Sequence, residues 1–313
     1  MKKVLFATTA LVATAGMAAA EVSFGGFGRF GLFYDEGNAE DTRIEQRFRL
    51  TATGTTTSDN GLEFEGRIRF QTDDQANGQS NVANNSAAGF AVSTGGFRLD
   101  VGHVSDVIDS GDVVNYYGYG VGLTSFAEQS SGMGLPASGF GTGTANVSPT
   151  VKLRYQVGDF TASASITDDS PVTAGTTVTE RSEYQIGFGY NFGNYSAGIA
   201  FGNESTDTNG VETADNDFVA LSFDGEIGAF AFSILITDYD ANADTGYGFS
   251  VKYDVGAATE IRFVFADSGV AGADETVAIG FQHGLGGGVS LRGGVGTNTA
   301  GNTVADLGVV FNF

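Results

Sequence analysis

Three arginines at alternating positions in one short stretch form the most distinctive chemical pattern in this chain. Within residues 42–54, Arg43, Arg47 and Arg49 alternate with apolar residues such as Ile44 and Phe48. A repeat of two is that of a β-strand whose two faces meet different surroundings. Cations only a few ångströms apart repel one another, so the arginine face indicates a counter-charge nearby or a task for the positive charge.

The same pattern extends over the first three predicted strands, which places six cations on one wall. The members of this wall are Arg29, Arg43, Arg47, Arg49, Arg67 and Arg69. Carboxylates of the same face offset part of the charge, at Glu45, Glu63 and Glu65. The excess of positive charge predicts that this wall faces water and acts on charged solutes.

The longest connection, residues 104–148, carries a candidate counter-charge in Asp106, Asp109, Asp112 and Glu128. A connection of 45 residues is far beyond ordinary loop length, which indicates a functional or a disordered segment. Tyrosines near its start favour packing against another surface. The inner wall of a closed sheet is the surface available to it.

Catalytic chemistry finds little support. The chain has no cysteine and only two histidines, His103 and His283, which we expect at strand ends near the rim. The stretch GFGRFG at 26–31 matches a dinucleotide-binding pattern but lies inside an alternating strand, without the helix that the motif requires. No G-x-S-x-G nucleophile motif occurs. We therefore predict that the protein is not an enzyme.

A bound cation is a weaker alternative for the acidic connection. Clustered carboxylates such as Asp106, Asp109 and Asp112 favour calcium, which prefers oxygen ligands. Their spacing is not that of an EF-hand loop, however, and solvated acids are the stronger interpretation. We predict no metal site and no cofactor.

Alternation of apolar and polar residues predicts about sixteen strands and almost no helix. With 48 glycines and three prolines the chain is rich in turns, and no apolar run after residue 20 reaches the roughly 20 residues of a membrane helix. The predicted strands span 21–34, 42–54, 61–72, 87–94, 96–103, 149–157, 160–167, 181–192, 195–202, 216–224, 228–238, 246–254, 259–266, 275–283, 289–296 and 303–313.

The connections between these strands alternate between short turns and longer acidic loops. Short turns on one rim and long loops on the other are typical of an outer-membrane β-barrel. All thirteen basic residues after residue 20 take the parity opposite to the apolar face. A soluble sandwich would also separate the faces, but it would not explain the two kinds of connection. The fold prediction is a 16-stranded antiparallel transmembrane β-barrel over residues 21–313.

The N-terminus predicts export. Lys2 and Lys3 precede an apolar stretch that ends in Ala18, Ala19 and Ala20, which is the pattern of a signal peptide over residues 1–20. A buried N-terminal strand is the alternative. The formal net charge of −22 becomes −24 once the two lysines are removed, which argues against nucleic acid as a partner.

The chain resembles the general porins of photosynthetic and related alphaproteobacteria. The resemblance is carried by LTATGTTTSDNGLEFEGRIRF (50–70), GNYSAGIAFG (193–202) and the final TVADLGVVFNF (303–313). It implies a homotrimer in the bacterial outer membrane, embedded in its lipid, with a third loop, about 104–148, folded into the lumen. In that picture the acidic loop residues Asp106, Asp109, Asp112 and Glu128 face the six-arginine wall across the constriction. Phe313 matches the signal read by the barrel assembly machinery.

Together, these features predict a water-filled channel for passive diffusion of ions and small hydrophilic solutes. The alternative is a secreted acidic β-rich adhesin or calcium-binding surface protein. Repeats of the G-G-x-G-x-D type would favour that alternative, and none occurs.

Overall fold

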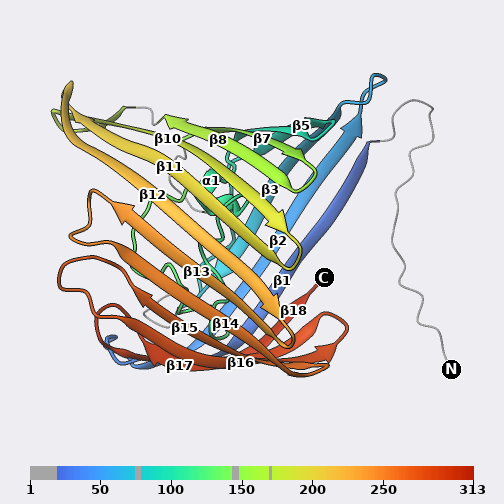
Figure 1. The fold of residues 1–313 in the computed structure, drawn as a ribbon, viewed down its shortest axis with the longest axis vertical. Helices are drawn as coiled ribbons and strands as arrows, with labels where there is room; N and C mark the ends of the chain where they lie inside the picture. Colours follow the sequence, from blue (N-terminus) through green and yellow to red (C-terminus); the bar gives the residue numbers. More distant parts are fainter. Residues whose placement is uncertain (1–19, 75–78, 143–147, 169–170) are drawn as a thin grey trace.

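A single antiparallel sheet of eighteen strands makes up almost all of the computed structural model, which describes residues 20–74, 79–142, 148–168 and 171–313 (Figure 1). The strands are β1 (Glu21–Asp35), β2 (Thr42–Thr57), β3 (Glu63–Asp73), β4 (Asn84–Asn85), β5 (Gly89–Thr94), β6 (Phe97–Gly102), β7 (Thr150–Val157), β8 (Phe160–Asp168), β9 (Val172–Ala174), β10 (Thr177–Phe192), β11 (Tyr195–Thr208), β12 (Val211–Ile227), β13 (Phe230–Tyr239), β14 (Gly246–Gly256), β15 (Thr259–Asp267), β16 (Thr276–Gly286), β17 (Val289–Thr297) and β18 (Thr303–Asn312). One short helix, α1 (Val107–Ser110), lies between β6 and β7.

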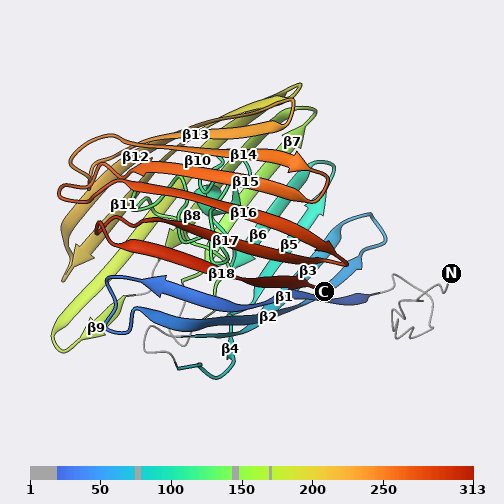
Figure 2. The same ribbon diagram turned by 90° about the horizontal axis from the view of Figure 1, so that it is seen from below.

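The sheet closes on itself, because β1 pairs with β2 on one side and with β18 on the other. Two short pieces, β4 and β9, pair only with the longer strands β3 and β10. The remaining sixteen strands form the ring seen in Figures 1 and 2. Closure leaves no unpaired edge, and the predicted 16-stranded barrel is confirmed.

Alternation along each strand separates an apolar outer face from a polar inner face. On β10, Tyr184, Ile186 and Phe188 are exposed, whereas Glu183 and Gln185, at the alternate positions, are buried inside the barrel. Exposed aliphatic and aromatic side chains of this kind occur on every long strand. An outward apolar face and an inward polar face are the pattern of a barrel that spans a membrane.

Several strands are longer than the sequence predicts, most of all β11 and β12. The connection expected at 203–215 is instead the tip of a hairpin, in which β11 and β12 continue to a turn at Asn209 and Gly210. Polar residues occupy both faces of this tip. Since both faces meet water beyond the bilayer, the apolar alternation that marks a strand is lost there.

The two ends of the barrel differ as predicted. Short turns such as those after β5, β7 and β10 lie at one end, which we call the short-turn rim, and the longer connections lie at the other. At the short-turn rim the last residue is paired, since Gly26 N–H donates to the Phe313 carbonyl oxygen at 3.0 Å. The predicted signal peptide, apart from its last residue, lies outside the described residues and stays a prediction.

Candidate functional site

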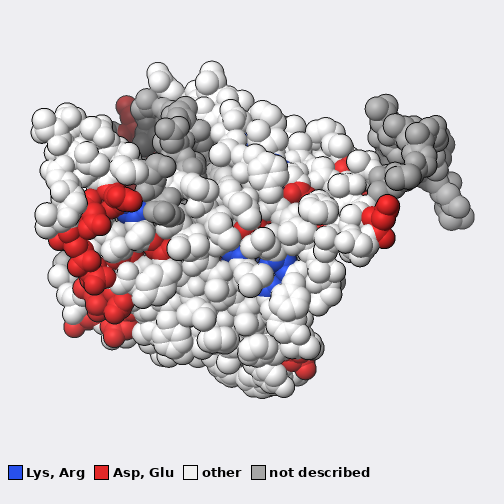
Figure 3. All heavy atoms as spheres, turned by 90° about the horizontal axis from the view of Figure 1, so that it is seen from above, with Lys and Arg blue, Asp and Glu red and all other residues white. Residues whose placement is uncertain are grey.

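Every basic residue of the described chain takes the inward parity of its strand. Arg29, for example, lies next to Phe30, whose side chain is 55% exposed on the outer face. In the view of Figure 3, basic side chains are visible in the hollow of the molecule, whereas acidic side chains gather over the end that carries the longer connections. The positive charge is therefore concentrated inside the barrel.

Three arginines of the predicted wall are paired with acids from the adjacent strand or its end. Arg29 Nε lies 2.5 Å from Glu45 Oε1. Arg43 Nε lies 2.6 Å from Asp74 Oδ2, and Arg47 pairs with Asp73. These strand carboxylates, rather than loop acids, supply most of the counter-charge that the wall requires.

The other three arginines, Arg49, Arg67 and Arg69, have no carboxylate partner among the described residues, and we call them the arginine trio. Arg49 donates to the Gln71 side-chain oxygen, and Arg69 donates to the backbone carbonyl of Phe140. The guanidinium carbons of Arg67 and Arg69 each lie 4.5 Å from the centre of the Phe140 ring. The trio therefore keeps an excess of positive charge that faces the lumen.

Two further arginines extend this positive surface. Arg262 on β15 and Arg292 on β17 share the inward face, and Arg292 is close enough to Arg262 and Arg29 to be repelled by both. Sequence reasoning placed the two on the inner face but not beside the predicted wall. Only the pairing of β18 with β1 brings β17 near the first strands, so nothing in the local pattern marked them.

The connection between β6 and β7 runs inside the barrel, and we call its described part, residues 103–142, the inner loop. It begins at α1, where the Asp106 side chain accepts a hydrogen bond from the Asp109 backbone N–H at 2.7 Å. Asp106 also accepts from the Ser138 N–H, so one buried carboxylate joins the outgoing and returning parts of the inner loop. Burial raises the pKa of Asp106 to about 7.

Inward hydroxyls on β8, β12 and β14 accept hydrogen bonds from the backbone of the inner loop. Val107 N–H donates to Ser165 Oγ at 3.3 Å, Asn115 N–H to Ser222 Oγ at 3.1 Å, and Tyr119 N–H to Ser250 Oγ at 2.9 Å. Farther round, Leu123 and Thr124 N–H both donate to the Asp306 carboxylate at 2.8 Å. A loop that would otherwise carry unpaired polar groups is in this way fixed to the wall.

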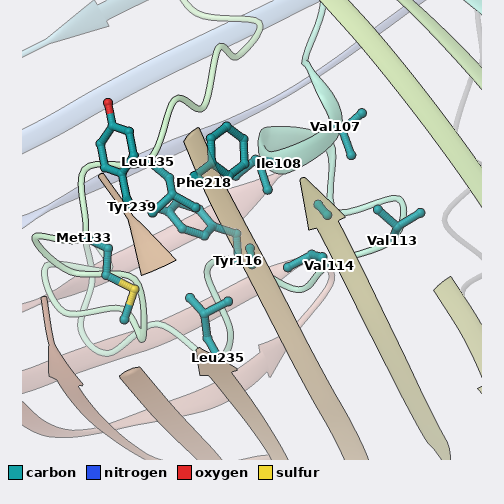
Figure 4. Packing of buried hydrophobic residues seen from close by; sticks show 12 residues of the cluster. Val107, Ile108, Val113, Val114, Tyr116, Met133, Leu135, Phe218, Leu235 and Tyr239 are labelled. Carbon is teal, nitrogen blue, oxygen red and sulfur yellow. The ribbon is translucent and has the colours of Figure 1, made fainter. Parts of the chain in front are cut away.

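A hydrophobic cluster fixes the same loop to β11, β12 and β13 (Figure 4). Its loop members are Val107, Ile108, Val113, Val114, Tyr116, Met133 and Leu135, and its strand members are Ala200, Phe218, Ala220, Leu235 and Tyr239. Ile108 and Leu235 have no exposed surface. Burial of this apolar area favours the docked position of the inner loop.

Glycines make room for the loop against the strands. A Cβ on Gly198 of β11 would overlap with the carbonyl oxygen of Val113, and one on Gly248 of β14 would overlap with that of Gln129. Any larger residue at these positions would push the inner loop into the lumen. The wall below the loop is therefore shaped for close backbone approach.

The expectation that the four loop acids face the six arginines is wrong for three of them. Asp106 is buried inside the inner loop, and Asp112 pairs with Lys152 at 2.6 Å and Arg154 at 3.0 Å instead. Glu128 has no ion pair among the described residues. The physical reason is proximity for two of them, because backbone N–H groups bind Asp106 and the cations of β7 bind Asp112.

Asp109 is the exception, since it lies near enough to Arg69 to attract it electrostatically. Its carboxylate also accepts a hydrogen bond from the Tyr117 hydroxyl at 2.7 Å. The loop residue that touches the arginine trio directly is Phe140, an aromatic residue that the search for counter-charges could not find.

Burial and neighbouring charge shift the pKa values of the inner-loop acids in different directions. Burial raises the pKa of Glu128 to about 7. Burial acts to raise the pKa of Asp112, but Lys152 and Arg154 bring it below its ordinary value. His103 is buried against Phe140 rather than exposed at the rim. Within the described ranges no group of three or more His, Cys, Asp or Glu side chains could hold a metal ion, and no helix is long and apolar enough to cross a membrane.

The chain is similar to known proteins in sequence and in fold. The family model described as Gram-negative porin matches residues 7–303. The chain is 31% identical over 305 residues to a porin of Fuscovulum blasticum and 27% identical over 319 residues to a porin of Rhodobacter capsulatus, in each case covering 94% of this chain and all of the relative. Among solved structures, a mutant of the Rh. blastica porin aligns with a TM-score of 0.76 at 26% identity, over 94% of this chain and all of that one.

Proposed function

The chain belongs to the Gram-negative porin family and is a channel of the outer membrane, and from that premise we propose that the arginine trio and the inner loop together border its constriction. Ions and small hydrophilic solutes would cross this constriction by passive diffusion. The trio is Arg49, Arg67 and Arg69, and the inner loop approaches it through Phe140 and Asp109.

The observation that carries the proposal is the unbalanced charge of the trio. Arg29, Arg43 and Arg47 are neutralised by paired carboxylates, so they add little net field. The trio is not neutralised and lies where the loop comes closest to the wall. A positive surface at the narrowest point orders water and favours anions, while apolar solutes cannot replace the hydration that they lose there.

We propose the remaining partners on the same basis. A homotrimer would bury part of the outward apolar face, which carries Phe24 and Phe30 among its exposed residues. Phe313 stacks on Phe48 with ring centres 5.5 Å apart and closes the seam between the first and last strands. We propose that the barrel assembly machinery recognises this residue before the seam closes. We also propose that the protein catalyses no reaction.

Conductance across a planar bilayer tests the proposal. Purified protein in detergent should insert in discrete steps, and reversal potentials should be measured at about 0.1 M and about 1 M salt, where the screening lengths are about 10 Å and 3 Å. Arg69→Ala should shift selectivity toward cations, more strongly at low salt. The matched control is Arg181→Ala, which removes one charge from a pair with Glu204 outside the trio.

Two outcomes would contradict the proposal at different levels. If the purified protein produced no discrete conductance steps, the diffusion pore itself would be contradicted. Equal shifts for R69A and R181A would leave the pore but place its selective point elsewhere.

A further inference from the structure

A second group of cations surrounds a small pocket below the base of the inner loop. The pocket has a volume of about 190 Å³ and is lined by four basic side chains, those of Arg67, Arg98, Lys152 and Arg154. The hydroxyl-bearing residues Ser105 and Ser110 of the inner loop complete the side nearest α1. Only Arg67 is shared with the arginine trio.

The pocket lies toward the short-turn rim. Arg98 of β6 is directly opposite Arg154 of β7 in the sheet, and both are within a few residues of the turns that end these strands. Lys152 lies two residues farther from the short-turn rim on β7, opposite Asp100. A solute would therefore reach the pocket from the short-turn end of the lumen, after or before it passes the proposed constriction.

Carboxylates neutralise this group only in part. Asp112 of the inner loop binds both Lys152 and Arg154, so one carboxylate is shared between two cations. Arg98 lies 3.0 Å from Asp100 and 3.2 Å from Glu65.

Arg67 has no ion pair among the described residues, and its guanidinium carbon lies 4.5 Å from the centre of the Phe140 ring. Four cations thus face three carboxylates, which leaves an excess of positive charge around the pocket.

Donor groups are also left over. Arg154 Nε is buried and has no hydrogen-bond partner within the part of the chain that the structure describes. The side chains of Arg98 and Arg154 remain 25% and 34% exposed, so water in the lumen reaches them. Guanidinium groups present paired N–H donors that match the oxygens of phosphate and carboxylate, and the Ser105 hydroxyl adds a further donor. The Ser110 hydroxyl already donates to the Val107 carbonyl oxygen at 3.1 Å.

We propose that this pocket binds a small oxyanion of the phosphate class, held by Arg98, Arg154 and Lys152 with the hydroxyl of Ser105. Asp112 occupies two of these cations in the structure and competes with the anion. Phosphate binding to the pocket does not depend on transport. A raised concentration of anions beside the constriction would follow from it, and that consequence rests on the proposed channel function.

Equilibrium binding of inorganic phosphate to the detergent-purified full chain tests the pocket. Titration calorimetry at about pH 8, with chloride replaced by phosphate at constant ionic strength, should give a saturable signal. Arg154→Gln and Arg98→Gln should each weaken phosphate binding about tenfold, the size expected when a charged hydrogen-bonding partner is lost. The matched control Arg181→Gln removes the same charge at the other end of the lumen and should change the affinity less than about twofold.

A variant of opposite sign keeps the test decisive if the arginine variants fold poorly. Asp112→Asn frees Lys152 and Arg154 without removing a cation, so it should tighten phosphate binding severalfold. Absence of saturable binding to the wild-type chain, an equal loss for R181Q, or unchanged affinity for D112N would each overturn the proposal. Single-channel steps of the same preparations report separately on the proposed function, so steps without phosphate binding would reject only the pocket.

Discussion

Two walls of the same barrel, built from strands of similar geometry, carry opposite inward chemistry. The wall of β1, β2 and β3 presents long cations, half of them paired with acids of the adjacent strand or its end. The wall of β10 to β14 presents serines, glycines and buried apolar residues, and the inner loop is docked on it. The charged side chains of the first wall face the lumen. The second wall instead buries its inner surface against the inner loop.

The difference shows how one closed sheet makes a narrow channel with one charged side. A loop that hydrogen-bonds to inward serines cannot dock where arginines fill the same space. Arg67 and Arg69 meet the loop at their guanidinium groups, through Phe140, whereas glycines on the other wall let the loop backbone approach the sheet itself. The proposed constriction lies at the boundary between the two, where Phe140 contacts Arg67 and Arg69.

The strongest way to break this contrast is to make the loop-bearing wall bulky. Gly198→Val should displace the inner loop, since a Cβ there overlaps with the Val113 carbonyl oxygen. We expect single-channel conductance to change by roughly half or more, because the loop borders the smallest cross-section. The control is Gly284→Val on β16, where the nearest atom to a new Cβ is the Ala258 carbonyl oxygen at 3.7 Å. Conductance that changes equally in both variants would contradict close docking at Gly198.

Charge pairing on the arginine wall can be tested by stability. Arg29→Ala leaves the carboxylate of Glu45 nearly buried and unpaired, which should lower the free energy of unfolding by about 1–3 kcal/mol. Arg49→Ala leaves no carboxylate without a partner and relieves repulsion from Arg69 and Arg47. It should therefore lower the free energy of unfolding by less.

The apparent melting temperature at a fixed heating rate compares these variants. The double variant R29A/E45A should recover most of the loss. If R49A were as damaging as R29A, the division of the wall into paired and unpaired arginines would be wrong.

The loop side should respond to pH through Glu128. Because burial raises its folded-state pKa to about 7, the folded protein holds this proton more tightly than the unfolded chain does. The associated stability is complete below the ordinary pKa of 4.5 and is lost as the pH rises to about 7.

Thermal unfolding at about pH 5 and pH 8 measures this effect. Glu128→Gln should reduce the difference between the two pH values, although Asp106, whose pKa is also about 7, retains part of it. Glu212→Gln, at an exposed position on the hairpin of β11 and β12, is the control. If E128Q left the pH dependence of stability unchanged, groups other than Glu128 would be responsible for it.

The smallest expected effect concerns a single hydroxyl below the loop. Ser222→Ala removes the acceptor of the Asn115 N–H and should destabilise the protein by about 1 kcal/mol. Ser196→Ala, nearer the short-turn rim on β11, is a matched control. Equal melting temperatures for S222A and the wild type would mean that water replaces the hydroxyl without loss.

Local pattern was sufficient to predict the barrel. Alternation in stretches such as 181–192 and 303–313 requires an apolar outer face, and the charge of Arg43, Arg47 and Arg49 requires a watery inner one. The pattern fails at the tip of β11 and β12, where both faces meet water and no alternation remains, and it also misses β4, β9 and the start of β10.

The sequence by itself determined the number of barrel strands, the face that each side chain takes and the wall on which the arginines gather, because these follow from a repeat of two along single strands. The tertiary structure alone decided which charges pair. Asp112 binds Lys152 and Arg154, and Phe140 contacts Arg67 and Arg69 of the trio. Across the seam between β1 and β18, Arg292 lies near enough to Arg29 to be repelled by it. Such contacts depend on distances across the lumen, which are set by barrel closure and by the path of the inner loop, and no local repeat encodes them.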